Sequence, residues 1–274
     1  MAARPEARRG TLANGMDFAT WGSGPKTLLY LPGGPGSSIP DGLMARTSQR
    51  WFDPFVDSGY AVRYVTRRRH QPRGHTVADM ADDVGAMIVD ELGGRVDLVL
   101  GESFGGMIAL HLAARQGDCL DRLAVVVAAA EVSAWGKEVD GRLLAALARS
   151  DLAAAGSAFA EYALPGDGTR WLRRLAGPLI ARSLFSGKRF PTSDVLVETE
   201  SELTFDARGA LPDIRVPVVL ISGDRDRFFP QNIVEETVRL IPDCTLIAYE
   251  GKGHLQVASD RRVAHDIVAF VSQR

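Results

Sequence analysis

The chain of 274 residues has only two cysteines, Cys119 and Cys244. Two cysteines are too few for the disulfide framework on which small secreted domains depend. The longest unbroken apolar run, residues 123–130, is too short to cross a bilayer. The basic amino terminus, residues 1–15, lacks the apolar segment of a signal peptide. These absences predict a cytoplasmic protein that does not enter a membrane.

The chain also lacks an excess of either charge, because 32 Lys and Arg face 34 Asp and Glu and leave a formal net charge of -2. This balance gives no electrostatic reason to expect a nucleic acid partner. Apolar residues make up 46% and charged residues 24%, which is typical of a soluble protein with a sizeable core. The length suits one medium domain or one domain with an insertion. We expect no bound metal and no cofactor.

Short apolar runs alternate with amphipathic stretches along most of the chain. The runs predict strands at 26–31, 61–66, 96–100, 123–130, 217–222 and 244–249, and the stretches predict helices at 76–92, 104–115, 233–241 and 260–273. Strands that are apolar on both faces and separated by helices indicate an α/β fold, a mostly parallel sheet with helices on both faces. The carboxyl ends of such strands meet at one edge, where α/β proteins form their sites.

Residues 131–208 break this alternation, since they are rich in Ala, Leu and Arg with helical spacing. Residues 141–164 predict two helices and residues 169–185 predict another. This segment is interpreted as a helical insertion between two strands of a core formed by residues 1–130 and 209–274. We expect the insertion to cover the site, because it follows a central strand at the productive edge of the sheet.

The sequence Gly101-Glu102-Ser103-Phe104-Gly105 matches the pattern G-x-S-x-G. A predicted strand leads into it and a predicted helix leads out, which is the setting of a serine nucleophile on a strained turn. The alternative is an ordinary glycine-rich turn between a strand and a helix. The flanking elements favour the nucleophile.

A serine nucleophile needs a base, and the chain has five histidines, at positions 70, 75, 111, 254 and 265. His111 and His265 lie in helical patterns, which favours packing or surface roles. His70 and His75 lie in an arginine-rich loop, where nothing marks either as the base. His254 lies in the loop just after the strand 244–249, so it lies at the same sheet edge as Ser103.

The base in turn needs a carboxylate that fixes its tautomer and stabilises the imidazolium. Asp224 and Asp226 both follow the strand 217–222 at the productive edge. Both residues could instead cap the turn or the next helix. Asp224 looks like part of the turn itself, which predicts that its side chain bonds to the local backbone.

These residues resemble the α/β-hydrolase fold superfamily. The order Ser103, Asp226, His254 matches the nucleophile–acid–base order of that superfamily. Its acid commonly appears as G-x-x-D with a proline four residues later, matched here by Gly223, Asp226 and Pro230, and His254 closes a G-x-G-H run. The resemblance covers most of the chain and places the helical insertion where the superfamily has its cap domain. It favours Asp226 over Asp224 as the acid.

The loop Pro32-Gly33-Gly34-Pro35-Gly36 resembles the H-G-G-P-G loop of the proline iminopeptidase-like branch, with Pro32 in place of the histidine. The resemblance implies that the backbone N–H groups of Gly34 and Phe104 form an oxyanion hole. Pro35 has no N–H to donate. A phosphate-binding loop is not expected, because no G-K-[ST] follows.

The interpretation favoured by these residues is a serine hydrolase with a Ser-Asp-His triad. Its substrate would be a small or medium ester, lactone or thioester, cleaved through an acyl-enzyme on Ser103. The cap would supply apolar walls, and the candidates are Trp135, Phe159, Tyr162, Trp171, Phe185 and Phe190.

Two alternatives stay open: a proline iminopeptidase-like aminopeptidase and a non-catalytic, ligand-binding member of the fold. Two departures count against the aminopeptidase. In residues 67–75, only an Arg-Gly pair remains of the D-x-R-G-x-G-like stretch that is usual in that branch. The insertion also has no Trp-Glu pairing that would bind a substrate amine.

Overall fold

The computed structural model describes residues 8–185, 187 and 189–273. Its centre is an eight-stranded sheet with the strand order β1-β2-β4-β3-β5-β6-β7-β8. The strands are β1 (Arg8–Thr11), β2 (Asp17–Trp21), β3 (Lys26–Leu31), β4 (Tyr60–Val65), β5 (Leu98–Glu102), β6 (Leu123–Val126), β7 (Val218–Gly223) and β8 (Cys244–Tyr249). The neighbours from β4 through β8 pair in parallel, whereas β2 pairs antiparallel with both of its neighbours, β1 and β4.

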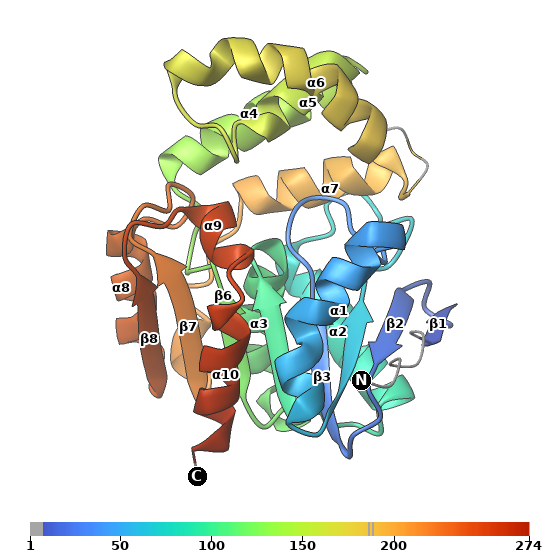
Figure 1. Cartoon of the computed structure of the whole chain (residues 1–274), viewed down its shortest axis with the longest axis vertical. Coiled ribbons are helices and arrows are strands. Elements are labelled where there is room, and N and C mark those ends of the chain that lie inside the picture. The colour runs from blue at the N-terminus through green and yellow to red at the C-terminus, as the bar shows by residue number, and fades with distance from the viewer. Residues whose placement is uncertain (1–7, 186, 188, 274) are drawn as a thin grey trace.

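Helices cover both faces of the sheet (Figure 1). They are α1 (Gly42–Asp57), α2 (Val77–Glu91), α3 (Phe104–Arg115), α4 (Ala134–Ala148), α5 (Leu152–Ala160), α6 (Arg170–Leu184), α7 (Thr192–Leu203), α8 (Gln231–Leu240), α9 (His254–Ala258) and α10 (Arg262–Ser272). Buried residues of α1 and α10 pack on one face, and those of α2, α3 and α8 pack on the other. The parallel sheet covered on both sides confirms the predicted fold.

Most predicted strands and helices occur within two residues of their expected positions, but the strand expected over 123–130 is shorter. β6 ends at Val126, and the backbone then turns through Val127, whose φ is +47°. Residues 127–130 are fully buried but lie beyond β6, although the N–H of Val127 still donates to the carbonyl oxygen of Ile221 in β7. The apolar run therefore indicated burial over its whole length but strand only over its first half.

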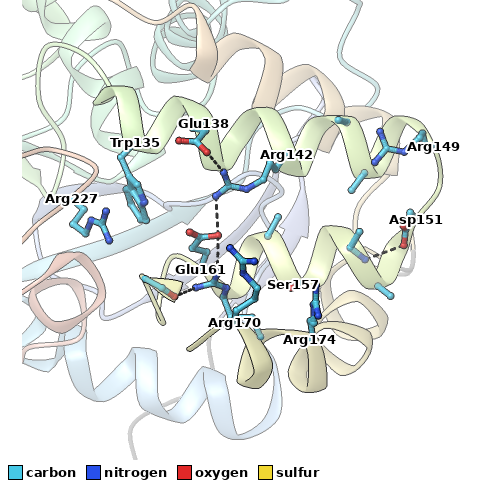
Figure 2. Close-up of a pocket in the computed structure, with 17 residues that line it drawn as sticks. Trp135, Glu138, Arg142, Arg149, Asp151, Ser157, Glu161, Arg170, Arg174 and Arg227 are labelled. Atoms are coloured by element: carbon cyan, nitrogen blue, oxygen red, sulfur yellow. Dashed lines mark hydrogen bonds and ion pairs between the residues drawn. The ribbon is translucent and has the colours of Figure 1, made fainter. Parts of the chain in front are cut away.

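The helices α4, α5, α6 and α7 lie beyond the carboxyl edge of the sheet (Figure 1). α7 lies across this edge, and α4, α5 and α6 form a further layer above it. A pocket of about 770 Å³ opens between α4, α5 and α6 (Figure 2). The expected helices at 141–164 and 169–185 correspond to α4, α5 and α6, although α4 begins earlier, at Ala134. The division into a core and a cap over 131–208 stays our prediction.

Within the described ranges, no helix combines the length and the apolar character that a membrane span requires.

Candidate active site

Ser103 lies on the turn between β5 and α3 with φ +50° and ψ -116°, a strained conformation for a residue with a side chain. Its N–H donates to the carbonyl oxygen of Val126 at 2.8 Å, which ties the turn to the next strand. Gly105 is needed at the start of α3, because a Cβ there would lie 2.1 Å from the carbonyl oxygen of Leu31. The sequence thus forms a tight turn that holds the hydroxyl of Ser103 at the sheet edge.

The structure brings Ser103, His254 and Asp226 together in one hydrogen-bonded chain. The Oγ of Ser103 lies 2.9 Å from Nε2 of His254, and Nδ1 of His254 lies 2.8 Å from Oδ2 of Asp226. The other carboxylate oxygen of Asp226 accepts the backbone N–H groups of Phe228 and Phe229 at 2.8 and 3.2 Å. Asp226 is 3% exposed, so these donors fix its orientation in a site with little solvent.

Asp224 has a different partner. Its Oδ1 accepts the N–H of Gly251 at 2.7 Å, across 27 residues of chain. The expectation that Asp224 bonds to the backbone of its own turn is therefore wrong. The turn directs this exposed carboxylate towards the loop that precedes His254, where it supports the loop and not the imidazole ring.

Aromatic rings surround the imidazole of His254. The ring of Phe229 stacks on it at a centroid distance of 5.9 Å, and the ring of Phe228 lies at 5.3 Å. Trp135 contacts Phe228 edge to face at 5.1 Å. His254, Phe228, Trp135 and Tyr162 all line one pocket of about 330 Å³. The base therefore faces a space that is lined in part by aromatic rings and has the size that small ligands occupy.

The glycine-rich loop after β3 approaches Ser103 closely. A Cβ on Gly33 would lie 3.0 Å from Cβ of Ser103. The next residue, Gly34, has φ +71°, which favours glycine. Phe104 is the fully buried first residue of α3. Within the described part of the chain, the N–H groups of Gly34 and Phe104 donate to no other residue, and the oxyanion hole at these positions stays a prediction.

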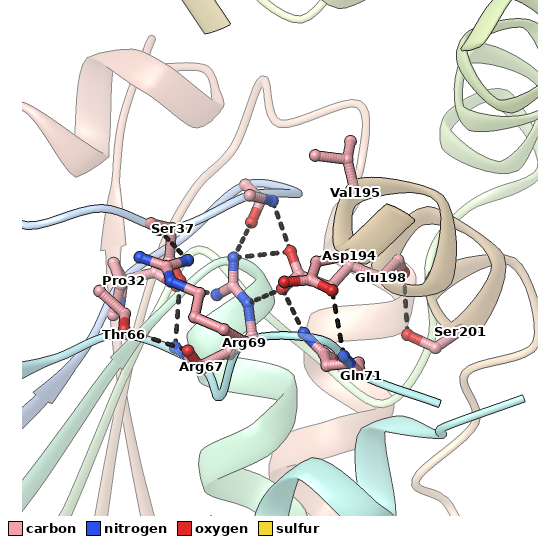
Figure 3. A network of polar contacts seen from close by, with 12 residues as sticks. Pro32, Ser37, Thr66, Arg67, Arg69, Gln71, Asp194, Val195, Glu198 and Ser201 are labelled. Atoms are coloured by element: carbon pink, nitrogen blue, oxygen red, sulfur yellow. Dashed lines mark hydrogen bonds and ion pairs between the residues drawn. The ribbon is translucent and has the colours of Figure 1, made fainter. Parts of the chain in front are cut away.

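Arg67, directly after β4, holds the carbonyl groups of this loop (Figure 3). Its Nη1 donates to the carbonyl oxygen of Pro32 at 2.9 Å, and its Nη2 donates to that of Gly34 at 2.6 Å. The guanidinium also lies over the ring of Phe104 at 4.6 Å. Because the carbonyl groups of the loop are held from behind, its peptide planes have a fixed orientation next to Ser103.

A buried carboxylate of α7 completes this arrangement. Glu198 pairs with Arg67 through Nε–Oε1 at 2.8 Å and Nη2–Oε2 at 3.0 Å, and their side chains are 1% and 4% exposed. Glu198 also accepts the N–H of Gly36 and the side-chain amide of Gln71. Asp194, which lies one helical turn before Glu198 in α7, accepts the N–H groups of residues 70 and 71. α7 is thereby anchored to the glycine-rich loop and to the segment after β4.

Sequence reasoning missed the roles of Arg67, Glu198 and Asp194. In the sequence, Arg67 is only the first of residues 67–75, which depart from the D-x-R-G-x-G-like stretch. A signal was available, because Arg67 follows a strand that ends at the productive sheet edge. No comparable signal marks Glu198, since it lies 131 residues further along the chain.

Glu102, the residue before Ser103, has a hydrogen-bond partner outside the triad. Its carboxylate accepts the hydroxyl of Tyr30 at 2.9 Å. Burial raises the pKa of Glu102, and the hydrogen bond from Tyr30 and the charge of His254 oppose this rise. Burial also raises the pKa of Tyr30 well above its ordinary value.

Two further buried carboxyl groups lie in the helices above the sheet edge. Asp140 of α4 accepts the hydroxyl of Tyr162, and its other oxygen, Oδ2, has no hydrogen-bond partner among the described residues. Burial raises the pKa of Asp140 to about 7, against the opposing effects of Tyr162 and His254. Burial also raises the pKa of Glu202 in α7 well above its ordinary value, with a further contribution from Asp140.

Three of the other histidines have structural partners, and the fourth, His265 in α10, is exposed. His75 pairs with Asp83 at 2.9 Å, and His111 meets the ring of Phe205 edge to face. The N–H of His70 donates to Asp194.

The aromatic residues suggested as cap walls separate into three groups. Trp135 and Tyr162 line the pocket of His254, whereas Phe185 and Phe190 belong to the apolar cluster between α4, α5, α6 and α7, and Phe159 packs against it. Trp171 is 61% exposed. Only the first two can therefore contact a ligand beside His254 in this arrangement.

No group of three or more His, Cys, Asp or Glu side chains in the described ranges is arranged to hold a metal ion.

The profile of the Alpha/beta hydrolase family matches residues 28–266. The chain therefore belongs to the alpha/beta hydrolase family. This family is broader than the proline iminopeptidase-like branch, and membership in that branch stays a resemblance carried by the loop at residues 32–36.

Two curated relatives show moderate similarity. A protein of Yersinia enterocolitica, provisionally named carbamate hydrolase RutD, is 27% identical over 63% of this chain and 61% of its own length. The chain thus matches less than two thirds of that relative. A pimeloyl-[acyl-carrier protein] methyl ester esterase of Neisseria meningitidis is 29% identical over 82% of this chain and 70% of its own length.

Solved structures share the fold. The enol-lactonase from Burkholderia xenovorans has a TM-score of 0.69 at 20% identity and covers 95% of this chain and 98% of its own. An esterase from Exiguobacterium antarcticum has a TM-score of 0.71 at 17% identity, with coverages of 97% and 99%. At these identities the likeness concerns the fold alone.

Proposed function

We propose that this protein is a serine hydrolase that cleaves a small or medium ester, lactone or thioester through an acyl-enzyme on Ser103. The observation that carries the proposal is the hydrogen-bonded chain of Ser103, His254 and Asp226 at the carboxyl edge of the sheet. The name of the esterase relative supports a carboxylic ester substrate.

Each residue of the hydrogen-bonded triad has a defined role in the proposed reaction. His254 accepts the proton of Ser103 through Nε2 as Oγ attacks the substrate carbonyl carbon. Asp226 accepts a hydrogen bond from Nδ1–H, holds the tautomer and stabilises the imidazolium. His254 then protonates the leaving alcohol or thiol. Water, deprotonated by the same ring, attacks the acyl-enzyme and releases the acid.

The tetrahedral oxyanion would be held by the backbone N–H groups of Gly34 and Phe104. Their lack of other partners in the described chain supports this role. A donor of this kind typically contributes about 3–4 kcal/mol to catalysis. Arg67 acts as a positioning residue, because it holds the carbonyl oxygen of Gly34 without reaching the substrate.

The pocket beside His254 supports an acyl or alcohol group of modest size. Its volume of about 330 Å³ is near the lower end of the range for small-molecule sites. The rings of Trp135, Tyr162 and Phe228 favour an apolar group there.

An aminopeptidase is the second candidate, and one observation favours it. Asp140 and Glu202 are buried carboxyl groups in the helices above the site, and one oxygen of Asp140 has no partner in the described residues. A substrate ammonium group could pair with such carboxyl groups. Burial, however, favours their neutral forms, which weakens this pairing.

A substrate panel distinguishes these functions. The panel contains p-nitrophenyl butyrate, a butyryl thioester, a small lactone and prolyl p-nitroanilide, each tested with the wild type and with Ser103→Ala. We expect turnover of the oxygen and sulfur esters and none by the variant. Preferential cleavage of the anilide would establish the aminopeptidase, and no turnover of any substrate by folded protein would refute the hydrolase.

A further inference from the structure

The pocket between α4, α5 and α6 is unusually rich in arginine (Figure 2). Its volume is about 770 Å³, and six guanidinium groups line it, from Arg142, Arg149, Arg170, Arg173, Arg174 and Arg227. Three carboxylates also line it, from Glu138, Asp151 and Glu161. The lining charge is therefore 6 − 3 = +3, in a chain whose overall formal charge is -2. Such a local excess attracts anions.

The three carboxylates already have partners. Glu138 and Glu161 both pair with Arg142, and Glu161 also lies 3.5 Å from Arg173. Asp151 caps α5 by accepting the N–H of Ala154 at 3.0 Å. The acidic side chains are therefore engaged and leave part of the positive charge uncompensated.

Arg173 serves the cap itself, since it is 5% exposed and donates to the carbonyl oxygens of Leu164 and Gly166 at 2.7 Å. Arg149 and Arg174 differ from it. Both are exposed, and neither guanidinium has a hydrogen bond or ion pair with a residue in the described ranges. Figure 2 shows Arg149 at the end of α4 near Asp151, and Arg174 on α6 near Ser157.

The opposite end of the pocket leads towards the candidate active site. Arg227 stacks on the indole of Trp135 at 4.3 Å, and no carboxylate in the described chain pairs with it. Arg227 and Trp135 line both the arginine pocket and the pocket of His254. The two pockets therefore adjoin at this stacked pair, and an elongated molecule could occupy both.

From this geometry we propose that the arginine pocket binds the phosphate or diphosphate end of an acyl compound whose carbonyl lies at Ser103. Guanidinium forks match phosphate oxygens and form charge-assisted hydrogen bonds with them. A pocket between helices suits a small molecule, whereas a nucleic acid requires an extended basic surface. The combined pockets fit a thioester of the coenzyme A type, with its acyl end beside His254 and its phosphates between Arg149 and Arg174.

The inference rests on the proposed function for its chemical step. Ser103 takes the acyl group, the thiolate leaves with the proton carried by His254, and water then releases the carboxylic acid. The balanced reaction is thioester plus water to acid plus thiol, with no oxidant or metal. Anion binding itself needs no hydrolysis and can be measured separately.

The binding test uses inorganic diphosphate and calorimetry, with potassium chloride at equal ionic strength as the control. Diphosphate should bind to the wild type and to Ser103→Ala and should raise the Tm of both. The double variant Arg149→Gln/Arg174→Gln should lose this binding. The matched double variant Arg46→Gln/Arg182→Gln removes the same charge from exposed positions outside the pocket and should retain it.

The kinetic test compares butyryl-coenzyme A with the butyryl thioester of N-acetylcysteamine, which has no phosphate. A third substrate is a phosphorylated butyryl oxygen ester. Its kcat/KM shows whether the pocket recognises any phosphate-bearing ester or specifically the coenzyme A thioester. In Arg149→Gln/Arg174→Gln, the ratio of kcat/KM for the phosphate-bearing thioester to that for the truncated thioester should fall about 100-fold, roughly tenfold for each lost charged hydrogen bond. In the control variant the ratio should be unchanged.

The outcomes separate the two proposals. Ester cleavage without diphosphate binding, or an unchanged ratio in Arg149→Gln/Arg174→Gln, refutes the phosphate site and leaves the hydrolase in place. Diphosphate binding without cleavage of any ester supports the site and refutes the proposed reaction. Equal loss of binding in both double variants would show that only total charge matters, which also refutes the site.

Discussion

The buried pair of Arg67 and Glu198 gives the sharpest test of how the structure supports the site. Replacing Arg67 by Met leaves the carboxylate of Glu198 buried, with only the N–H of Gly36 and the amide of Gln71 as donors. Breaking a buried ion pair from one side costs about 3–5 kcal/mol of unfolding free energy. This is a large share of the roughly 5–15 kcal/mol that stabilises a typical protein.

Replacing both partners by Met should cost less than this. The buried charges are then gone. The loss is the two hydrogen bonds from Arg67 to Pro32 and Gly34, which Arg67→Met alone also loses, and the two that Glu198 accepts from Gly36 and Gln71, about 1 kcal/mol each. Urea unfolding of the wild type, both single variants and the double variant gives the coupling energy of the pair. We expect Arg67→Met/Glu198→Met to be more stable than Arg67→Met alone.

The same variants should separate stability from catalysis. Arg67→Met/Glu198→Met frees the carbonyl groups of the glycine-rich loop, so kcat should fall while KM for p-nitrophenyl butyrate changes little. The upper limit is the roughly 10²–10³-fold loss that follows removal of one oxyanion donor. Additive unfolding free energies, or an unchanged kcat in the double variant, would refute this account of the loop.

Three further predictions concern single residues. Asp226→Asn should lower kcat by about 10⁴ because the imidazole adopts the wrong tautomer, whereas Asp224→Asn should mainly lower stability, by about 1 kcal/mol; the reverse pattern in esterase assays would reassign the acid. Gly105→Ala should lower the urea midpoint strongly, because its Cβ would meet the carbonyl oxygen of Leu31; an unchanged midpoint would contradict this contact. Burial raises the pKa of Asp140 from about 3.8 in the unfolded chain to about 7, so the contribution of Asp140 to stability falls as the pH rises through this window. Asp140→Asn should therefore flatten the dependence of Tm on pH between 4 and 7. An equally steep dependence in the variant would disprove this prediction.

Much of the fold could be predicted because the parallel strands are apolar on both faces and alternate with helices. β1 was missed because its four residues, Arg8–Thr11, are all exposed and carry no apolar pattern. β2 was also missed. α1 was missed although it spans 16 residues, and Pro54 near its end is a helix-breaking signal in sequence.

The site could be predicted where a residue follows a strand directly. Ser103, Asp226 and His254 each lie just beyond a strand end, so the shared edge of a parallel sheet brings them together. The partner of Asp224 could not be predicted, because the hydrogen bond to Gly251 depends on how two loops meet. The pairing of Glu198 with Arg67 is likewise tertiary and leaves no local pattern.

Covalent labelling of Ser103 tests the central claim most directly. A fluorophosphonate reacts with a serine that an adjacent base activates, whatever the natural substrate is. We predict one phosphonate per chain on the peptide that contains Ser103, identified by mass spectrometry, and no labelling of folded Ser103→Ala. A folded wild-type protein that stays unlabelled, or that is labelled at a different serine, would contradict the proposed nucleophile.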